Sequence, residues 1–275
     1  MIFVLSYGRF RSGESLMRIG RSLALAAASI LLGAAVPAPA TAGHPLGTED
    51  AATLGRGNVE VEFNGEGSRS GGGSEIQVGN AYTLGLHPRL DLAVSLAYLF
   101  LPAGDGTAAE RGFGDTEATL KTSFHDGQGW VPGLGLKAGV LLPTGDEDRG
   151  LGDGRGRGIL TAIADWEIDR FRIHANVGNE TILRTAGGTA RNTTMKASLA
   201  GEWEPRDGWS LVGEYLWQKD SGVASPLSEL AAGVVAQVSS RVAFDLGMRW
   251  GLAGEGPDAT WLAGLTLAFP GDRLP

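Results

Sequence analysis

The sequence predicts an all-β protein, a transmembrane antiparallel up-and-down β-barrel of about twelve strands preceded by a cleaved signal peptide. Runs of about ten residues alternate apolar and polar side chains from Asn58 to Phe269. The clearest run, Val242 to Trp250, has apolar residues on one parity and charge and glycine on the other. Period two is the strand period, and a tilted run of this length crosses a bilayer. A dozen such runs in series therefore predict a membrane barrel.

Residues 1–42 predict an export signal. Two arginines precede a short apolar stretch, and Ala40-Thr41-Ala42 forms an A-x-A cleavage site. We therefore expect the mature chain to start at Gly43. Met17 alone begins a complete signal, so the true start stays open between Met1 and Met17.

The segments that flank the predicted barrel, 43–57 and 270–275, lack strand alternation. Two expectations stand for residues 43–57: a small plug that enters the lumen from the periplasmic side, or a disordered tail. Residues 270–275 form a C-terminal tail behind Phe269.

The composition excludes several classes of function. Without residues 1–42 the chain carries 19 basic and 30 acidic side chains, a formal charge of −11, which argues against nucleic-acid binding. It has no cysteine, so disulfides and thiolate metal sites are absent. No stretch after Gly43 has the apolar length of a transmembrane helix. We expect one domain and no cofactor.

The strands follow from the alternating runs between Gly- and Asp-rich connections. They are predicted near 58–65, 75–86, 90–100, 114–124, 131–142, 159–168, 171–181, 192–203, 209–218, 228–238, 241–250 and 259–269. The connections alternate between short ones, such as Asp169-Arg170, and long ones at 66–74, 101–113, 143–158, 182–191, 219–227 and 252–258. Short periplasmic turns, longer outer loops and an even strand number are typical of outer-membrane barrels.

Aromatic residues indicate which parity faces lipid. All seven tryptophans share the apolar parity and lie near strand ends. The predicted girdle beside the short turns contains Trp130, Trp166, Trp203, Trp209, Phe124, Phe171 and Phe269, and that beside the long loops contains Trp217, Trp250, Trp261 and Phe100. Aromatic rings favour the headgroup zone of a bilayer. A soluble β-sandwich, the alternative, would bury its tryptophans instead.

The other parity predicts the lumen, since charge is costly against lipid. It carries Glu60, Glu62, Asp91, Glu117, Lys121, Lys137, Asp165, Glu167, Arg172, His174, Glu180, Lys196, Glu202, Glu214, Glu229, Asp245 and Arg249. These groups either pair and fill a closed interior or line a wet path for a solute. With eleven acids against five bases, cations or neutral molecules are the expected solutes. The inward glycines Gly135, Gly139, Gly178, Gly233, Gly247 and Gly264 leave room in the lumen or mark strand kinks.

Weaker candidates for chemistry remain. His174 beside Ser198 on the next strand would be needed for a hydrolase, but a lone lumen histidine is more often structural. An acidic cluster at 146–153 has carboxylates for calcium, yet its spacing does not match an EF-hand, and a solvated acidic loop explains it. We therefore predict no catalytic residues and no metal site.

Three short motifs resemble the meta-pathway phenol-degradation family of outer-membrane β-barrel transporters. They are the segment from His44-Pro45-Leu46 to Asn58, the sequence Gly112-Phe113-Gly114-Asp115, and Leu142-Pro143-Thr144-Gly145-Asp146. The resemblance implies a β-barrel and, by association, passage of small aromatic or hydrophobic compounds. Barrels of this kind usually end on an aromatic residue, whereas Phe269 is followed by six more residues.

The functional hypothesis is passive or binding-assisted uptake of a small organic solute across the outer membrane of a Gram-negative bacterium. Its rival is a non-transporting structural or surface-interaction barrel, and an outer-membrane hydrolase is third. The expected partners are the lipid bilayer, a small-molecule solute and the barrel assembly machinery, with no nucleic acid. The sequence identifies neither the solute nor the oligomeric state.

Overall fold

The computed structural model describes residues 43–71, 73–103, 108–183 and 193–271. The chain divides into the units Met1–Val36 and Pro37–Pro275, and every described residue falls in the second. The predicted signal peptide lies outside the described residues. The strands of the described part are β1 (Val59–Ser70), β2 (Gly73–His87), β3 (Leu90–Leu101), β4 (Glu110–Phe113), β5 (Thr116–Gln128), β6 (Val131–Leu142), β7 (Arg157–Ile168), β8 (Phe171–Ile182), β9 (Thr193–Arg206), β10 (Trp209–Asp220), β11 (Leu227–Ser239), β12 (Val242–Ala253) and β13 (Ala259–Phe269).

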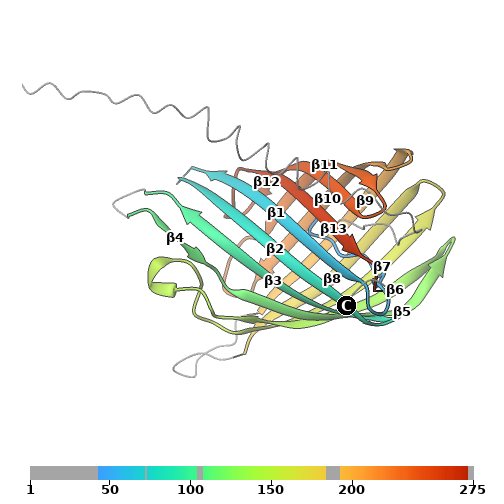
Figure 1. Cartoon of the computed structure of the whole chain (residues 1–275). Helices are drawn as coiled ribbons and strands as arrows, with labels where there is room; N and C mark the ends of the chain where they lie inside the picture. The colour runs from blue at the N-terminus through green and yellow to red at the C-terminus, as the bar shows by residue number, and fades with distance from the viewer. Residues whose placement is uncertain (1–42, 72, 104–107, 184–192, 272–275) are drawn as a thin grey trace, which may run out of the picture. The chain divides into compact units, whose positions relative to one another are not determined.

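The strands close into a single antiparallel barrel (Figure 1). Apart from β4, each strand pairs with the strands before and after it in sequence, and β1 pairs with both β2 and β13. This last pairing leaves no open edge, so the backbone polar groups of the wall satisfy one another. The result is a closed barrel of twelve strands plus one extra short strand, which confirms the predicted fold class.

The extra strand, β4, continues the line of β5. Both pair with β3, β4 through Tyr98–Phe113 and β5 through Ser95–Glu117. Between these two pairs the β4–β5 side carries one residue more than β3, which is a β-bulge at Gly114 and Asp115. The strand predicted near 114–124 is β5, which begins after the bulge, at Thr116. The long connection predicted at 101–113 was wrong at its end, because residues 110–113 form β4.

The other strands agree with the prediction to within a few residues, except at the first hairpin. The expected long loop at 66–74 is instead a tight connection, because β1 continues to Ser70 and β2 begins at Gly73. Gly65 and Gly67 interrupt the apolar parity there, yet their backbones still pair with β2 and β13. Several strands also extend past their predicted ends, as β9 does to Arg206.

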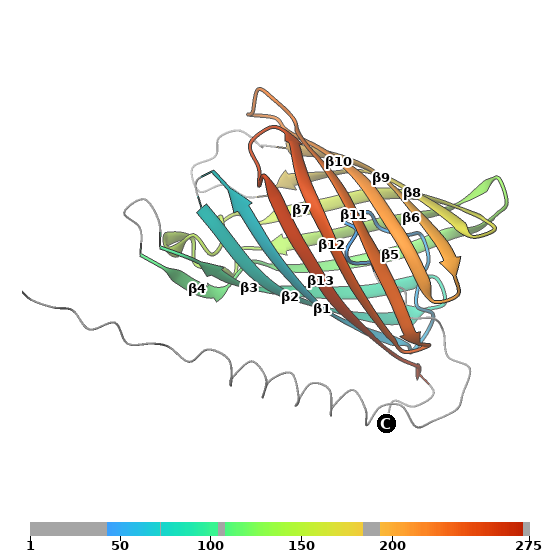
Figure 2. The same ribbon diagram turned by 90° about the horizontal axis from the view of Figure 1, so that it is seen from above.

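The two faces of the wall have opposite character. Leu199 and Leu246 face outward and are 55% and 62% exposed, whereas their sequence neighbours Ala200 and Asp245 are 2% and 3% exposed. A closed barrel in lipid must place apolar side chains outward and enclose its charges. Figures 1 and 2 show the strands tilted around this interior. No helix in the described part of the chain is long and apolar enough to cross a membrane.

The connection between β6 and β7 folds onto the wall instead of standing free. It contains a short 3₁₀ helix, Glu147–Arg149, followed by Leu151, which is only 3% exposed. A β-carbon at Gly112 would lie 2.6 Å from Leu151, so the leucine packs directly on β4. The Asp115 carboxylate accepts hydrogen bonds from the backbone amides of Gly145 (2.9 Å) and Asp153 (3.4 Å). The bulge thus positions the side chain that holds this loop.

Candidate functional site

Residues 43–54 run around the inner wall of the barrel. In Figures 1 and 2 this blue segment lies inside the ring of strands. It begins at β1, where the Gly43 amide donates to Glu62 (3.2 Å), and ends near β3, where the Leu54 amide donates to Asp91 (2.9 Å). Between these points it contacts the wall strand after strand. We call it the N-terminal segment.

The first half of the N-terminal segment is bound by carboxylates of β12 and β10. His44 Nδ1 lies 2.5 Å from Asp245 Oδ1, and both side chains are buried. Glu214 accepts hydrogen bonds from the backbone amides of Gly47 (3.0 Å) and Thr48 (2.5 Å). Glu214 is only 2% exposed, so the segment covers it completely.

The second half is bound by β8, β7, β6 and β5. Asn176 accepts from the Glu49 amide (2.7 Å) and donates to the Glu49 carbonyl (2.9 Å), as a paired strand would. The Ala51 amide donates to Asp165 (2.5 Å). Lys137 pairs with the Glu49 carboxylate (2.7 Å), and Lys121 pairs with Asp50 (3.0 Å). Side chains thus satisfy the backbone of a segment that has no regular structure.

Inward glycines provide the space that the N-terminal segment occupies. A β-carbon at Gly233 would lie 2.8 Å from Pro45, and one at Gly247 would lie 3.0 Å from Pro45. A β-carbon at Gly264 would lie 2.8 Å from His44 Nδ1 and 2.1 Å from Asp245 Oδ2. The space predicted beside these inward glycines is therefore present, but the N-terminal segment fills it. At Gly139 and Gly178, by contrast, the nearest atoms belong to neighbouring strands.

Three cavities lie along the segment. The first, about 830 Å³, is lined by residues at the short-turn end, among them Gln128 and Gly208, and by Asp50 to Thr53. The second, about 460 Å³, lies between the segment and the inner faces of β1, β2, β3 and β5. The third, about 310 Å³, lies toward the other end, between β7, β8, β9, β10 and β11.

The cavities share lining residues, so they follow one another through the lumen. Asp50, His174 and Glu202 line both the first and the second cavity. The second and third cavities share Gly47, Glu49, Glu117, Lys137 and Arg249. The segment therefore narrows the lumen at two junctions but leaves space on both sides of each.

Charges at the second junction are closely balanced. Lys137 lies 2.7 Å from Glu49 and 3.2 Å from Glu117. Burial raises the pKa of the Glu49 carboxyl, but the ammonium groups of Lys137 and Lys121 outweigh burial and hold that pKa below its ordinary value. Glu49 is therefore ionised at neutral pH, and the segment carries negative charge into the lumen.

Comparisons with known proteins identify the family of this chain. The family model described as "Putative MetA-pathway of phenol degradation" matches residues 40–269. The chain belongs to this family. The resemblance stated from the three short motifs is thus confirmed.

Solved structures similar to this member of the phenol-degradation family are outer-membrane proteins. The COG4313 outer membrane channel from Pseudomonas putida F1 has a TM-score of 0.59 and 16% sequence identity, over 80% of this chain and 98% of that chain. The NanC porin has a TM-score of 0.57 and 7% identity, over 75% of this chain and 98% of that chain. A comparison with curated proteins gives no match. At these identities the likeness is one of fold.

Two of the family motifs meet in the structure. Asp115 ends the second motif, and its carboxylate binds the amide of Gly145 in the third. The first motif begins with His44 and Pro45, which sit against Asp245 and the inward glycines. Residues of the three short motifs therefore make the contacts that position the N-terminal segment and the β6–β7 loop.

The predicted lumen residues divide into two groups by their surroundings. Those that line the cavities are Glu117, Lys121, Lys137, Asp165, Glu167, Arg172, His174, Glu180, Lys196, Glu202 and Arg249. Glu214 and Asp245 lie beneath the N-terminal segment. Three of the cavity-lining bases form ion pairs within the wall, Arg172 with Glu202 (3.4 Å), Lys196 with Glu180, and Lys137 with Glu117.

Sequence reasoning missed the partners supplied by the N-terminal segment. It considered pairing only among the inward charges of the wall, whereas Glu49 and Asp50 of the segment also bind Lys137 and Lys121. Asn176 and Thr48 were not singled out, although both are buried at the segment. The sequence feature that could have indicated these partners is the pair of adjacent acids, Glu49 and Asp50, in a stretch without strand alternation.

The pairing of His174 with Ser198 that the hydrolase hypothesis needs is not present in the described part of the chain. His174 Nδ1 lies 3.0 Å from Asp165 Oδ1, and Nε2 lies 3.4 Å from Glu202 Oε1. Ser198 instead contacts the Thr48 hydroxyl at 2.8 Å. Each ring nitrogen of His174 thus faces a carboxylate, and among the described residues the expected pairing of His174 with Ser198 does not form.

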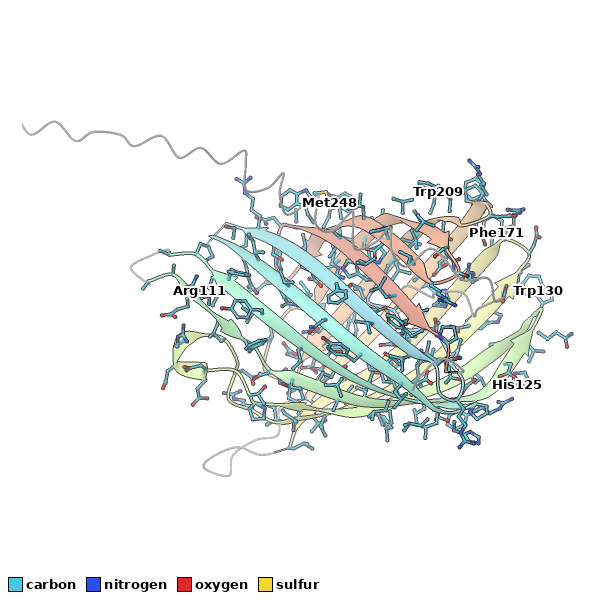
Figure 3. All side chains as sticks on the ribbon, viewed as in Figure 1. Arg111, His125, Trp130, Phe171, Trp209 and Met248 are labelled. Atoms are coloured by element: carbon cyan, nitrogen blue, oxygen red, sulfur yellow. The ribbon has the colours of Figure 1, made fainter. Side chains whose placement is uncertain are left out.

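The predicted girdle aromatics lie at both ends of the wall. Figure 3 shows Trp130, Phe171 and Trp209 at one end of the strands, with Arg111 toward the other. The rings of Phe171 and Trp203 stack with centroids 6.1 Å apart. The exposed members of the set are Phe100, Phe124, Trp130, Phe171, Trp203, Trp209, Trp250, Trp261 and Phe269, and the half-buried ones are Trp166 and Trp217. Their placement in a headgroup zone stays a prediction.

The acidic loop has its own partners. Asp153 pairs with Arg157, and Arg149 pairs with Glu110 at 2.7 Å. Among the described residues no group of histidines and carboxylates is arranged to hold a metal ion.

Proposed function

We propose that the protein is an outer-membrane channel for the passive or binding-assisted uptake of a small organic solute. The observation that carries this proposal is the series of cavities, each of which shares lining residues with the next. A lumen packed solid, as in eight-stranded barrels, would have no such series, and twelve strands enclose more space. The outer-membrane channel and porin with similar folds are consistent with this role.

The narrowness of the lumen limits the solute to a small molecule. The cavities on either side of the second junction measure about 460 and 310 Å³. The family description names phenol degradation, which favours a small aromatic solute. The lining is mixed in charge, so the solute should carry polar groups as well as an apolar body.

The experiment is single-channel recording from the purified protein in planar bilayers. We expect measurable conductance that small organic solutes reduce, and a larger conductance from a variant without residues 43–54. An insulating barrel would support the rival role, a structural or surface-interaction protein. Equal conductance with and without the segment would show that it does not restrict the path.

A further inference from the structure

The basic residues of the lumen differ in how their charge is compensated. Lys121 and Lys137 pair with Glu49 and Asp50, while Lys196 and Arg172 pair with acids of neighbouring strands. Arg249 of β12 has no carboxylate within 4.0 Å among the described residues. Its Nε is buried and has no hydrogen-bond partner there. Among the described residues, Arg249 is thus the one base of this set that forms no ion pair.

The neighbours of Arg249 explain why it stays unpaired. In the register of the wall it lies opposite Ala231 on β11 and Thr260 on β13, neither of which carries charge. Glu229, on β11, is close enough to interact electrostatically but forms no ion pair with it. A cation in a confined lumen is costly unless water or a counter-ion solvates it. The arginine is therefore set to accept an anion from outside the protein.

Arg249 lies at the second junction of the lumen. It lines both the second and the third cavity, and Lys137 and Glu117 line the same junction from the other side. The third cavity also has apolar side chains in its lining, Ile159, Leu216 and Leu227. Next to one guanidinium the structure therefore offers an apolar surface in a space of about 310 Å³.

We propose that Arg249 is the recognition group for a small organic monocarboxylate whose apolar body packs in the third cavity. The inference rests on the proposed channel function and specifies the class of its solute. A guanidinium presents two parallel N–H donors that match the two oxygens of a carboxylate. The acid-rich remainder of the lumen disfavours inorganic anions, so the apolar contact and the single arginine act together to select the solute.

The test uses benzoate as the probe and benzamide as its neutral isostere. In planar bilayers benzoate should reduce the potassium current of the full protein at concentrations at least tenfold below those that benzamide needs. Arg249→Gln should weaken the benzoate effect at least tenfold, and Arg249→Lys, which keeps the charge but not the bidentate fork, by less. Arg69→Gln, the same charge change at an exposed position on the outer end of β1, is the matched control and should leave the effect within twofold.

Calorimetric binding of benzoate to the detergent-solubilised protein separates two kinds of failure. If the protein does not conduct but binds benzoate in a manner that depends on Arg249, the channel function is overturned and the recognition site is supported. Equal benzoate affinity in the full protein and in Arg249→Gln would overturn the recognition site whatever the conductance. Equal affinity for benzoate and benzamide would overturn it too, and this comparison needs no folded variant.

Discussion

Glu49 connects two lysines of the wall to the N-terminal segment. Its carboxylate lies 2.7 Å from Lys137 and 3.9 Å from Lys121, and its backbone pairs with Asn176. These contacts tie β5, β6 and β8 to one residue of the segment. A single side chain therefore contributes both to the charge balance of the lumen and to the position of the segment.

Substitution of Glu49 should destabilise the protein and loosen the segment. Glu49→Gln leaves Lys137 with Glu117 alone, and we expect the free energy of unfolding to fall by about 1.5–3 kcal/mol, the usual range for a hydrogen bond to a charged group. Urea unfolding in lipid vesicles measures the loss. Glu147→Gln, in the exposed β6–β7 loop, is the control. A change no larger than in the control would contradict the role given to Glu49.

The contribution of Glu49 to the stability of the protein should depend on pH. Because the folded pKa is lowered from 4.5, the carboxylate contributes fully above about 4.5, and its contribution is lost as the pH falls through the lowered value. The stability difference between the native protein and Glu49→Gln should therefore shrink below pH 4.5. The groups that face this carboxylate are Lys121, Lys137, Asp50, Glu62 and Glu117. A difference that stays constant from pH 7 to pH 3 would refute the assignment.

At the scale of elements, the N-terminal segment fits the wall through the inward glycines. Gly264 faces the buried pair of His44 and Asp245, and an added methyl group would overlap both side chains. Gly264→Ala should displace the start of the segment and raise the single-channel conductance severalfold. Gly201→Ala is the matched control, because a β-carbon there meets no atom within 4 Å. Unchanged conductance in Gly264→Ala would show that the pair tolerates the methyl group without moving.

The β6–β7 loop should depend on the Asp115 carboxylate in the same way. Asp115→Ala removes the acceptor for the amides of Gly145 and Asp153, at a cost of about 1 kcal/mol for each hydrogen bond. The loop should then become accessible to added protease while the barrel stays intact. Asp126→Ala, at the exposed end of β5, serves for comparison. Equal cleavage rates in the two variants would mean that Leu151 alone holds the loop.

The strands were predictable because their periodicity is local. β6 and β13 have the predicted bounds, since their alternation continues to both ends. The end of β1 was missed because Gly65 and Gly67 have no side chain, so the apolar and polar alternation stops there. Their backbones nevertheless pair normally. The bulge at Gly114 was missed for a related reason, as one extra residue changes no composition.

The site was less predictable, because distant residues build it. His44 meets Asp245 across 201 positions, and Thr48 meets Glu214 across 166. No periodic pattern indicates such a contact, and a segment without alternation fits a plug and a tail equally well. The list of inward charges was available from parity, whereas their partners were not.

Over the whole molecule, the charge of the lumen predicts its ion preference. The wall carries eleven acids and five bases on its inner parity, and Glu49 and Asp50 of the segment add to the excess. Low-dielectric walls focus this field, so cations should permeate better than anions. Reversal potentials in a potassium chloride gradient measure the preference. Anion selectivity at neutral pH would show that the assignment of the inner parity is wrong.

The circuit of the N-terminal segment around the wall bears on the order in which the protein folds. Its anchors lie on strands from both ends of the sequence, from Glu62 on β1 to Asp245 on the penultimate strand. The complete set of anchors therefore exists only where these strands stand together in one wall. We expect docking of the N-terminal segment to be a late step in the assembly of the barrel.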